Sequence, residues 1–173
     1  MAHKSLLLVD NDANFAELTK ACLLTKERIA NEVVIARDGV EAVEHLFNPG
    51  RAAPEEMPGL VLLDLSMPRR DGFWVLRKMR AAERTRFIPV VILTSSVDLE
   101  DVRLAYTLGA NGYLDKLSEG MPWDELVRSV ARYWLGINIT PNSLAGEENG
   151  FSRSLGRTLA ALPKTYYKDE KED

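Results

Sequence analysis

The chain has 173 residues, of which 46% are hydrophobic and 28% charged, so it has room for one packed domain and a modest extension. Its formal net charge of −4 argues against sequence-independent binding to nucleic acid, which requires clustered Lys and Arg side chains. A single cysteine, Cys22, excludes a disulfide within the chain and fits a cytoplasmic protein. The apolar run at residues 6–9 is too short for a signal peptide or a membrane span.

Five short apolar runs have the length and composition of β-strands. Most of them do not alternate between apolar and polar residues, and such continuous hydrophobic strands are typical of a parallel sheet covered on both faces. We predict strands at residues 5–9, 32–36, 60–64, 88–94 and 112–115.

Apolar stripes with helical spacing lie between and after these runs. Asp12 and Asp38 stand at N-cap positions, Glu41 has the capping-box spacing from Asp38, Gly109 stands at a C′ position and Pro122 at a helix start. The stripes consist of Phe15, Leu18 and Cys22; Val40, Val43 and Leu46; Phe73, Leu76 and Met79; Val102, Ala105 and Leu108; and Trp123, Leu126, Val127, Val130 and Trp134. Cys22 is predicted to be buried in the core. Five successive β–α pairs predict an α/β fold, a doubly wound five-stranded parallel sheet with right-handed crossovers.

Two segments lie outside this pattern. Residues 48–59 (NPGRAAPEEMPG) contain three prolines and no apolar periodicity, which predicts a surface loop. After Gly136 the chain becomes polar and turn-forming, so we divide it into a domain at 1–137 and a C-terminal extension at 138–173. Within the extension, the apolar spacing over residues 151–162 predicts a short amphipathic helix that forms only when it is docked.

Polar side chains gather where the predicted strands end. They are Asp10, Asn11, Asp12, Asp64, Thr94, Ser95 and Lys116. In an open α/β sheet, ligands bind outside the carboxyl ends of the strands. Three carboxylates placed there would repel one another unless a cation lay among them, and Mg²⁺ is the hard divalent ion that oxygen ligands favour. With charge neutralised by a metal and a lysine, one carboxylate can act as a nucleophile toward a phosphoryl group.

Four motifs in this order, LLLVDND, VLLDLSMPRRDG, IPVVILTSS and LGANGYLDK, resemble the receiver domain of two-component response regulators over about residues 4–136. The resemblance implies a flavodoxin-like (βα)5 receiver fold in which a sensor histidine kinase phosphorylates Asp64. It also implies that Asp10, Asp64 and the backbone carbonyl of Ser66 hold Mg²⁺. Further roles that it implies are phosphoryl contacts from Thr94 and Lys116, access beside the small Ser95, and a switch aromatic at Tyr113.

The sequence departs from the receiver pattern at two positions. Asn11 stands where the family has a second acidic metal ligand; its amide oxygen can still coordinate Mg²⁺, but the site has one negative charge less. Leu117 follows Lys116 where the family has a proline in a cis peptide. Because a cis bond before a residue other than proline costs roughly 2.5–4 kcal/mol, we predict a trans bond.

A narrower resemblance concerns the loop at 48–59 and the residues RYWL at 132–135, which are similar to those of single-domain regulators that partner bacterial and cyanobacterial phytochromes. It implies a phytochrome kinase as phosphodonor and signalling through protein contacts, with no enzymatic output. Receivers commonly pair through their fourth and fifth helices, where the extension begins, so we also predict a homodimer.

Two alternatives remain at this stage. One is a degenerate receiver that binds its partner without phosphorylation, which the residues Asn11 and Leu117 suggest. The other is a phosphatase with an aspartate nucleophile at Asp10, because Asp10-Asn11-Asp12 has the spacing of the DxD motif of such enzymes. That motif continues differently at Asn14, and the phosphatase hypothesis gives Asp64 no role.

Overall fold

The computed structural model describes residues 5–24, 30, 32–50 and 57–141, and the predicted helix at 151–162 lies outside these residues. The strands are β1 (Ser5–Val9), β2 (Glu32–Ala36), β3 (Leu60–Leu63), β4 (Val90–Thr94) and β5 (Gly112–Asp115). The α-helices are α1 (Ala13–Leu23), α2 (Gly39–Leu46), α3 (Gly72–Ala81), α4 (Leu99–Thr107) and α5 (Trp123–Arg132), and one π-helical turn, η2 (Tyr133–Ile137), continues α5. No helix in this part of the chain is long and apolar enough to cross a membrane.

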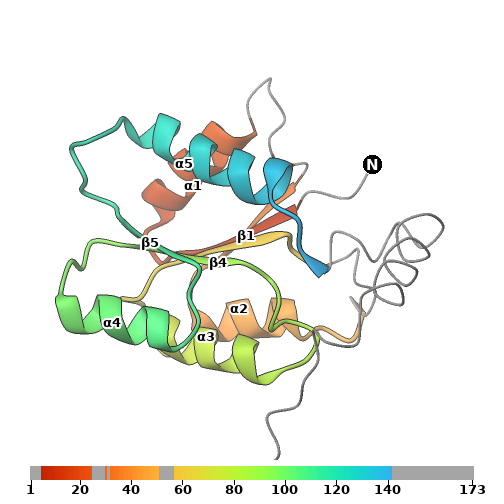
Figure 1. The fold of residues 1–173 in the computed structure, drawn as a ribbon. Coiled ribbons are helices and arrows are strands. Elements are labelled where there is room, and N and C mark those ends of the chain that lie inside the picture. The colour runs from red at the N-terminus through yellow and green to blue at the C-terminus, as the bar shows by residue number, and fades with distance from the viewer. Residues whose placement is uncertain (1–4, 25–29, 31, 51–56, 142–173) are drawn as a thin grey trace, which may run out of the picture.

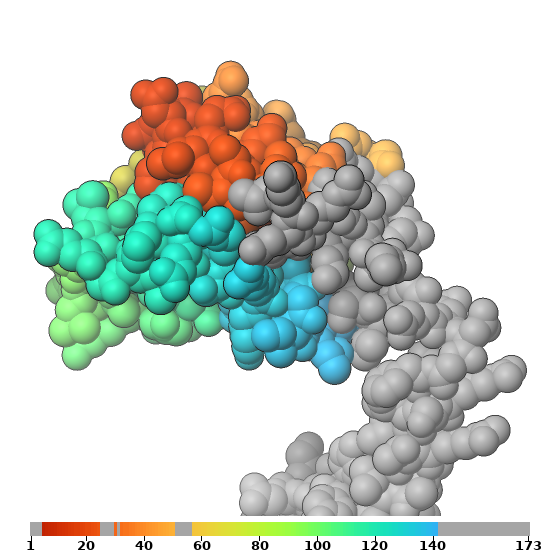
Figure 2. Space-filling view, turned by 90° about the horizontal axis from the view of Figure 1, so that it is seen from above, coloured from red at the N-terminus to blue at the C-terminus, as the bar shows by residue number. Residues whose placement is uncertain are grey.

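All strand pairs of the sheet are parallel, and the order is β2-β1-β3-β4-β5. Helices α1 and α5 cover one face, and α2, α3 and α4 cover the other (Figure 1). Seen from above, α1 and α5 lie side by side across the upper face (Figure 2). This arrangement confirms the predicted doubly wound, flavodoxin-like sheet.

Each face of the sheet has its own hydrophobic core. Side chains of β1, β3 and β4 alternate between the two cores, as the period of two along a strand requires. Every residue of these three strands is buried, which explains why their sequences are almost continuously apolar. Strands β3 and β4 are shorter than predicted, since Asp64 follows β3 and residues 88–89 precede β4.

The predicted buried face of α1 is wrong in part. Leu18 is 54% exposed, whereas Ala16, Thr19 and Leu23 are the buried residues of this helix. The face of α1 that packs on the sheet is therefore the one that carries Ala16, Thr19 and Leu23, and Leu18 lies on the solvent side. Cys22 is half-buried rather than fully buried, because it lies at the margin of the same face.

The predicted helix ends are mostly confirmed. Oδ1 of Asp38 accepts hydrogen bonds from the backbone N–H groups of Val40 and Glu41. Glu41 does not close a full capping box, because its carboxylate accepts from the N–H of Arg37 rather than from that of Asp38. Gly109 has a φ of +92°, the left-handed conformation predicted after α4.

Arg80 ties the amino ends of β4 and β5 to α3. Its guanidinium donates to the carbonyls of Arg86, Ile88 and Gly109 and to Oδ1 of Asn111. Burial lowers the pKa of Arg80 from its ordinary value. This cation therefore organises the edge of the sheet opposite the acidic side chains.

Candidate functional site

Two acidic side chains lie side by side at the point where the strand order reverses. Asp10 follows β1 and Asp64 follows β3; these strands are neighbours, with Val9 opposite Leu63. The N–H of Asp64 donates to the carbonyl of Val9 over 2.9 Å, which continues the sheet pairing up to the acids. Asp10 is 1% exposed and Asp64 6% exposed. Burial of two adjacent carboxylates requires a compensating positive charge.

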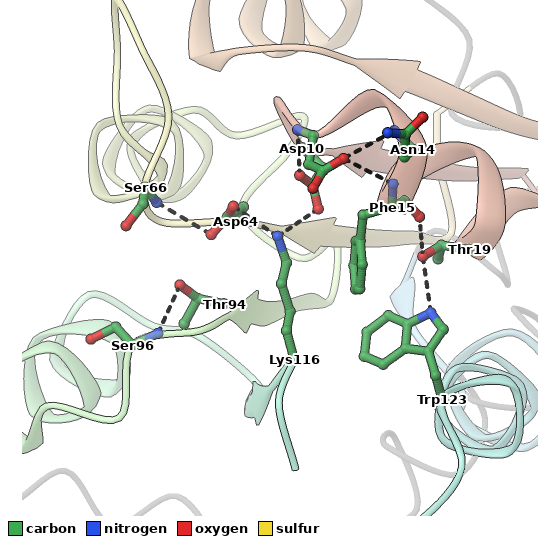
Figure 3. Close-up of polar contacts among 11 residues, drawn as sticks. Asp10, Asn14, Phe15, Thr19, Asp64, Ser66, Thr94, Ser96, Lys116 and Trp123 are labelled. Carbon is green, nitrogen blue, oxygen red and sulfur yellow. Dashed lines mark hydrogen bonds and ion pairs between the residues drawn. The ribbon is translucent and has the colours of Figure 1, made fainter. Parts of the chain in front are cut away.

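Lys116 supplies that charge. It comes directly after β5, where its N–H donates to the carbonyl of Thr94 over 2.8 Å. Its Nζ lies 2.8 Å from Oδ2 of Asp64 and 2.7 Å from Oδ2 of Asp10 (Figure 3). The Lys116 side chain is 11% exposed, so the ammonium interacts with both carboxylates in a largely desolvated site. Three strands that are distant in sequence thus contribute to one charge cluster.

Burial raises the pKa of Asp10, although the ammonium of Lys116 and the N–H of Asp12 oppose the shift, and the nearby charge of Asp64 adds to it. Oδ1 of Asp10 accepts the Asp12 N–H over 2.9 Å. Oδ2 meets Lys116 at ion-pair distance but receives no hydrogen bond of good geometry within the described part of the chain. This buried oxygen therefore has room for an additional electropositive partner.

The oxygen atoms around Asp10 suit a hard divalent cation such as Mg²⁺. Asp64 uses Oδ1 to accept the N–H of Ser66 over 3.2 Å, which places the Ser66 backbone close to the acids. Asp12 does not join them, since its carboxylate caps α1 through the N–H groups of Asn14 and Phe15. Among the described residues, no three Asp, Glu, His or Cys side chains could hold a metal together. The three clustered carboxylates predicted from the sequence are thus two, and Asn11 is exposed beside them.

The loop between β3 and α3, which carries Ser66, is fixed at both ends. Gly72 packs so closely on Asp64 that a side chain there would collide with the Asp64 carbonyl. Arg69 has a φ of +62°, a conformation that costs energy for this residue type, and its Nε donates to Oδ2 of Asp38 over 2.7 Å. Burial acts against ionisation of Asp38, but hydrogen bonds from the Glu41 N–H and Arg69 outweigh it and lower the pKa of Asp38. The α2 cap and the loop are thereby joined.

Thr94 is the last residue of β4, and Tyr113 is the second residue of the neighbouring strand β5. Thr94 is fully buried, and its Oγ1 accepts the N–H of Ser96 over 3.4 Å. The Tyr113 hydroxyl donates to the carbonyl of Ser96 over 3.0 Å, and burial raises the pKa of this phenol. Ser95 is exposed. Tyr113 thus anchors the loop after Thr94, while its role as a switch remains a prediction.

The structure brings Asp10, Asp64 and Lys116 into direct contact and places Asn11 and Ser95 at the solvent side of the site. The Lys116–Leu117 peptide bond is trans, as predicted. Sequence reasoning missed Phe15, whose ring faces the Lys116 ammonium. The sequence does hold a signal for this role, because Phe15 lies in the first turn of α1, directly after the acidic residues; the apolar spacing alone assigns it only to the core stripe.

A family model of the response regulator receiver domain matches residues 6–128. The chain belongs to this family, and the parallel sheet with its acidic site and lysine agrees with that membership.

Among its relatives is the response regulator Rcp1 of Synechocystis, 34% identical over 132 residues, which are 76% of this chain and 89% of Rcp1. A crystal structure of Rcp1 is described as its Mn²⁺-bound form; it is 33% identical with a TM-score of 0.68, covering 80% of this chain and 99% of the other. The phosphorylated cyanobacterial phytochrome response regulator RcpA is 31% identical with a TM-score of 0.72, covering 81% and 99%. The bacteriophytochrome response regulator AtBRR is 35% identical with a TM-score of 0.59, covering 79% and 94%.

We expect Asp10→Asn to raise the free energy of unfolding of the metal-free protein at neutral pH. Because the pKa of Asp10 is raised in the folded protein, the ionised carboxylate lowers the free energy of unfolding at any pH above that pKa. Asparagine keeps the oxygen that accepts the Asp12 N–H. The gain in the free energy of unfolding should shrink as the pH falls through the pKa of folded Asp10, and it should vanish near the ordinary aspartate pKa of 3.8. Urea unfolding in EDTA at a series of pH values measures it, and a difference independent of pH would contradict the assignment.

Proposed function

We propose that this chain is a single-domain response regulator that accepts a phosphoryl group on Asp64 from a histidine kinase. The observation that carries the proposal is the Lys116 ammonium, 2.8 Å from Asp64 and 2.7 Å from Asp10 at the switch point of the sheet. A carboxylate oxygen of Asp64 forms a bond to phosphorus while the bond from phosphorus to the donor imidazole nitrogen breaks. The product is an acyl phosphate, whose added negative charge Lys116 is placed to stabilise.

Mg²⁺ is the cofactor in this proposal. Asp10, Asp64 and the Ser66 carbonyl would hold it, with Asn11 as a neutral ligand. Oδ2 of Asp10 supports this set, because it is buried and, although it lies near Lys116, it accepts no hydrogen bond from the described residues. When bound, the ion supplies positive charge that offsets the carboxylates and the phosphoryl oxygens. The Mn²⁺-bound form of Rcp1 supports a divalent ion in a relative.

Thr94, Ser95 and Tyr113 complete the proposed site. The buried Thr94 hydroxyl, which accepts the N–H of Ser96 over 3.4 Å, would donate its own proton to a phosphoryl oxygen. Because the Tyr113 hydroxyl donates to the carbonyl of Ser96, a shift of the loop after β4 would break or move this hydrogen bond and so change the position of the Tyr113 ring. Exposed, small Ser95 leaves the approach to Asp64 open.

We propose a phytochrome kinase as the donor and a cytoplasmic setting, where the single cysteine would remain reduced. Two similar solved structures, RcpA and AtBRR, are a cyanobacterial phytochrome response regulator and a bacteriophytochrome response regulator, which supports this choice of partner. The output would be protein contacts, with no separate catalytic or nucleic-acid-binding function. Phosphotransfer from a panel of histidine kinases, with and without phytochrome sensory domains, would identify the donor.

Treatment with acetyl phosphate and Mg²⁺ should add one phosphoryl group, mapped by mass spectrometry to Asp64. Asp64→Asn should abolish the modification, because an amide oxygen is a poor nucleophile and forms no acyl phosphate. Label on Asp10, or label retained in Asp64→Asn, would refute the assignment. A folded protein that takes up no label from acetyl phosphate or from any kinase would favour the phosphorylation-independent interaction module.

Asn11→Asp should bind Mg²⁺ about five- to tenfold more tightly than the native chain, because one additional negative charge near the ion contributes about 1 kcal/mol in a solvent-accessible site. Tryptophan fluorescence can follow the titration, since Trp74 lies in the first turn of α3 after the acceptor loop. Asn14→Asp, on the exposed first turn of α1, serves as a control for added charge alone. Equal affinities in Asn11→Asp and the native chain would exclude position 11 from the metal site.

We also propose a homodimer that uses the α4–α5 side and the C-terminal extension. Large exposed hydrophobic side chains support it on and after α4; they are Leu99, Leu104, Tyr106, Leu117, Met121, Tyr133 and Ile137. In sedimentation at tens of micromolar, the full chain should be dimeric and a truncation after Ile137 should dissociate at least tenfold more readily. If both are monomers, or equally stable dimers, the extension has no part in self-association.

A further inference from the structure

The aromatic ring of Phe15 packs beside the Lys116 ammonium. Nζ of Lys116 lies 4.6 Å from the centroid of the Phe15 ring (Figure 3). At this distance an ammonium is attracted to the face of the ring by a cation–π interaction. The ring offers no hydrogen-bond acceptor, so the N–H groups of Lys116 remain available to Asp10 and Asp64.

Phe15 is itself fixed from behind. Its ring centroid lies 4.4 Å from that of Trp123, with the two planes tilted by 52°. Nε1 of Trp123 donates to Oγ1 of Thr19 over 3.2 Å, and this fully buried hydroxyl donates to the carbonyl of Phe15 over 2.8 Å. Trp123, the first residue of α5, thus contacts α1 at the Phe15 ring and at the Thr19 hydroxyl. The Phe15 ring therefore has little freedom to move away from Lys116.

The chain that follows Lys116 gives the ammonium no comparable support. Leu117 is 72% exposed, and residues 118–122 are exposed as well. The contacts of this turn are local: the N–H of Leu117 donates to Oδ1 of Asp115, and the N–H of Ser118 donates to the Asp115 carbonyl. A lysine side chain has a long flexible stem that must be ordered before its charge can act at one point.

We propose that Phe15, backed by Trp123, is a positioning residue that holds the Lys116 ammonium between Asp10 and Asp64. Phe15 acts through Lys116 and does not touch the phosphoryl group. The inference rests on the proposed function for its catalytic consequence, but the contact itself exists in the unphosphorylated protein. The contact between Phe15 and Lys116 and its effect on phosphorylation can therefore be tested separately.

The contact is tested by a double-mutant cycle on urea unfolding of the full chain, with Phe15→Leu and Lys116→Met. Phe15→Leu should reduce the folding equilibrium constant about three- to thirtyfold more in the native chain than in the Lys116→Met background, the range expected for a largely desolvated cation–π pair. Phe47→Leu is the matched control, because Phe47 is half-buried on the opposite core and should show no coupling to Lys116→Met. Absence of coupling at Phe15 would overturn the proposal.

The consequence is tested by Mg²⁺-dependent beryllofluoride binding and by the rate of labelling with acetyl phosphate. Phe15→Leu should weaken both about three- to tenfold, whereas Phe15→Tyr, which keeps the ring, should retain native values; a purely volume-filling role would not distinguish the variants in this way. If Phe15→Leu binds beryllofluoride and takes up label as the native chain does, the positioning role is overturned. If the native chain binds no beryllofluoride and takes up no label, the proposed function fails, while the unfolding cycle still decides whether Phe15 holds Lys116.

Discussion

The ion-pair interaction of Lys116 with Asp10 and Asp64 is the constraint on which the rest of this site depends. Two carboxylates buried side by side repel each other and lose their hydration, so the fold tolerates them only with a cation between them. The ammonium meets this need, yet it leaves Oδ2 of Asp10 without a hydrogen bond and the pKa of Asp10 raised. Lys116 thus offsets only part of the cost of burying the two carboxylates, and a divalent cation would supply further positive charge.

Parallel pairing makes such a cluster possible. Because all five strands point the same way, the residues after β1, β3, β4 and β5 meet at one edge, while Arg80 binds the opposite edge through backbone carbonyls. The hydrophobic cores on the two faces of the sheet pack tightly against the strands that end at this edge. Function therefore lies in the loops, as is usual for open α/β sheets.

The loops after β3 and β4 are bound by side chains of neighbouring elements close to Asp10 and Asp64. The loop after β3 is bound to the α2 cap through Arg69 and Asp38, and the loop after β4 is bound to Tyr113 through the Ser96 carbonyl. Phe15 and Trp123 link Lys116 to α1 and α5. Phosphorylation would add charge at the point where these connections converge, so one covalent change could reach helices on both faces of the sheet.

The sequence by itself determined the strand-forming runs, the order of the elements and the acidic and basic residues at the strand ends, because hydrophobic periodicity and chain order are local properties. Only the tertiary structure decided which side chains meet. Local spacing predicted the Asp12 cap of α1, but it did not show that Leu18 faces solvent or that Trp123 bonds to Thr19, 104 residues away. Those outcomes depend on how each helix is rotated and docked on the sheet, and that rotation is set by close packing between residues far apart in the chain.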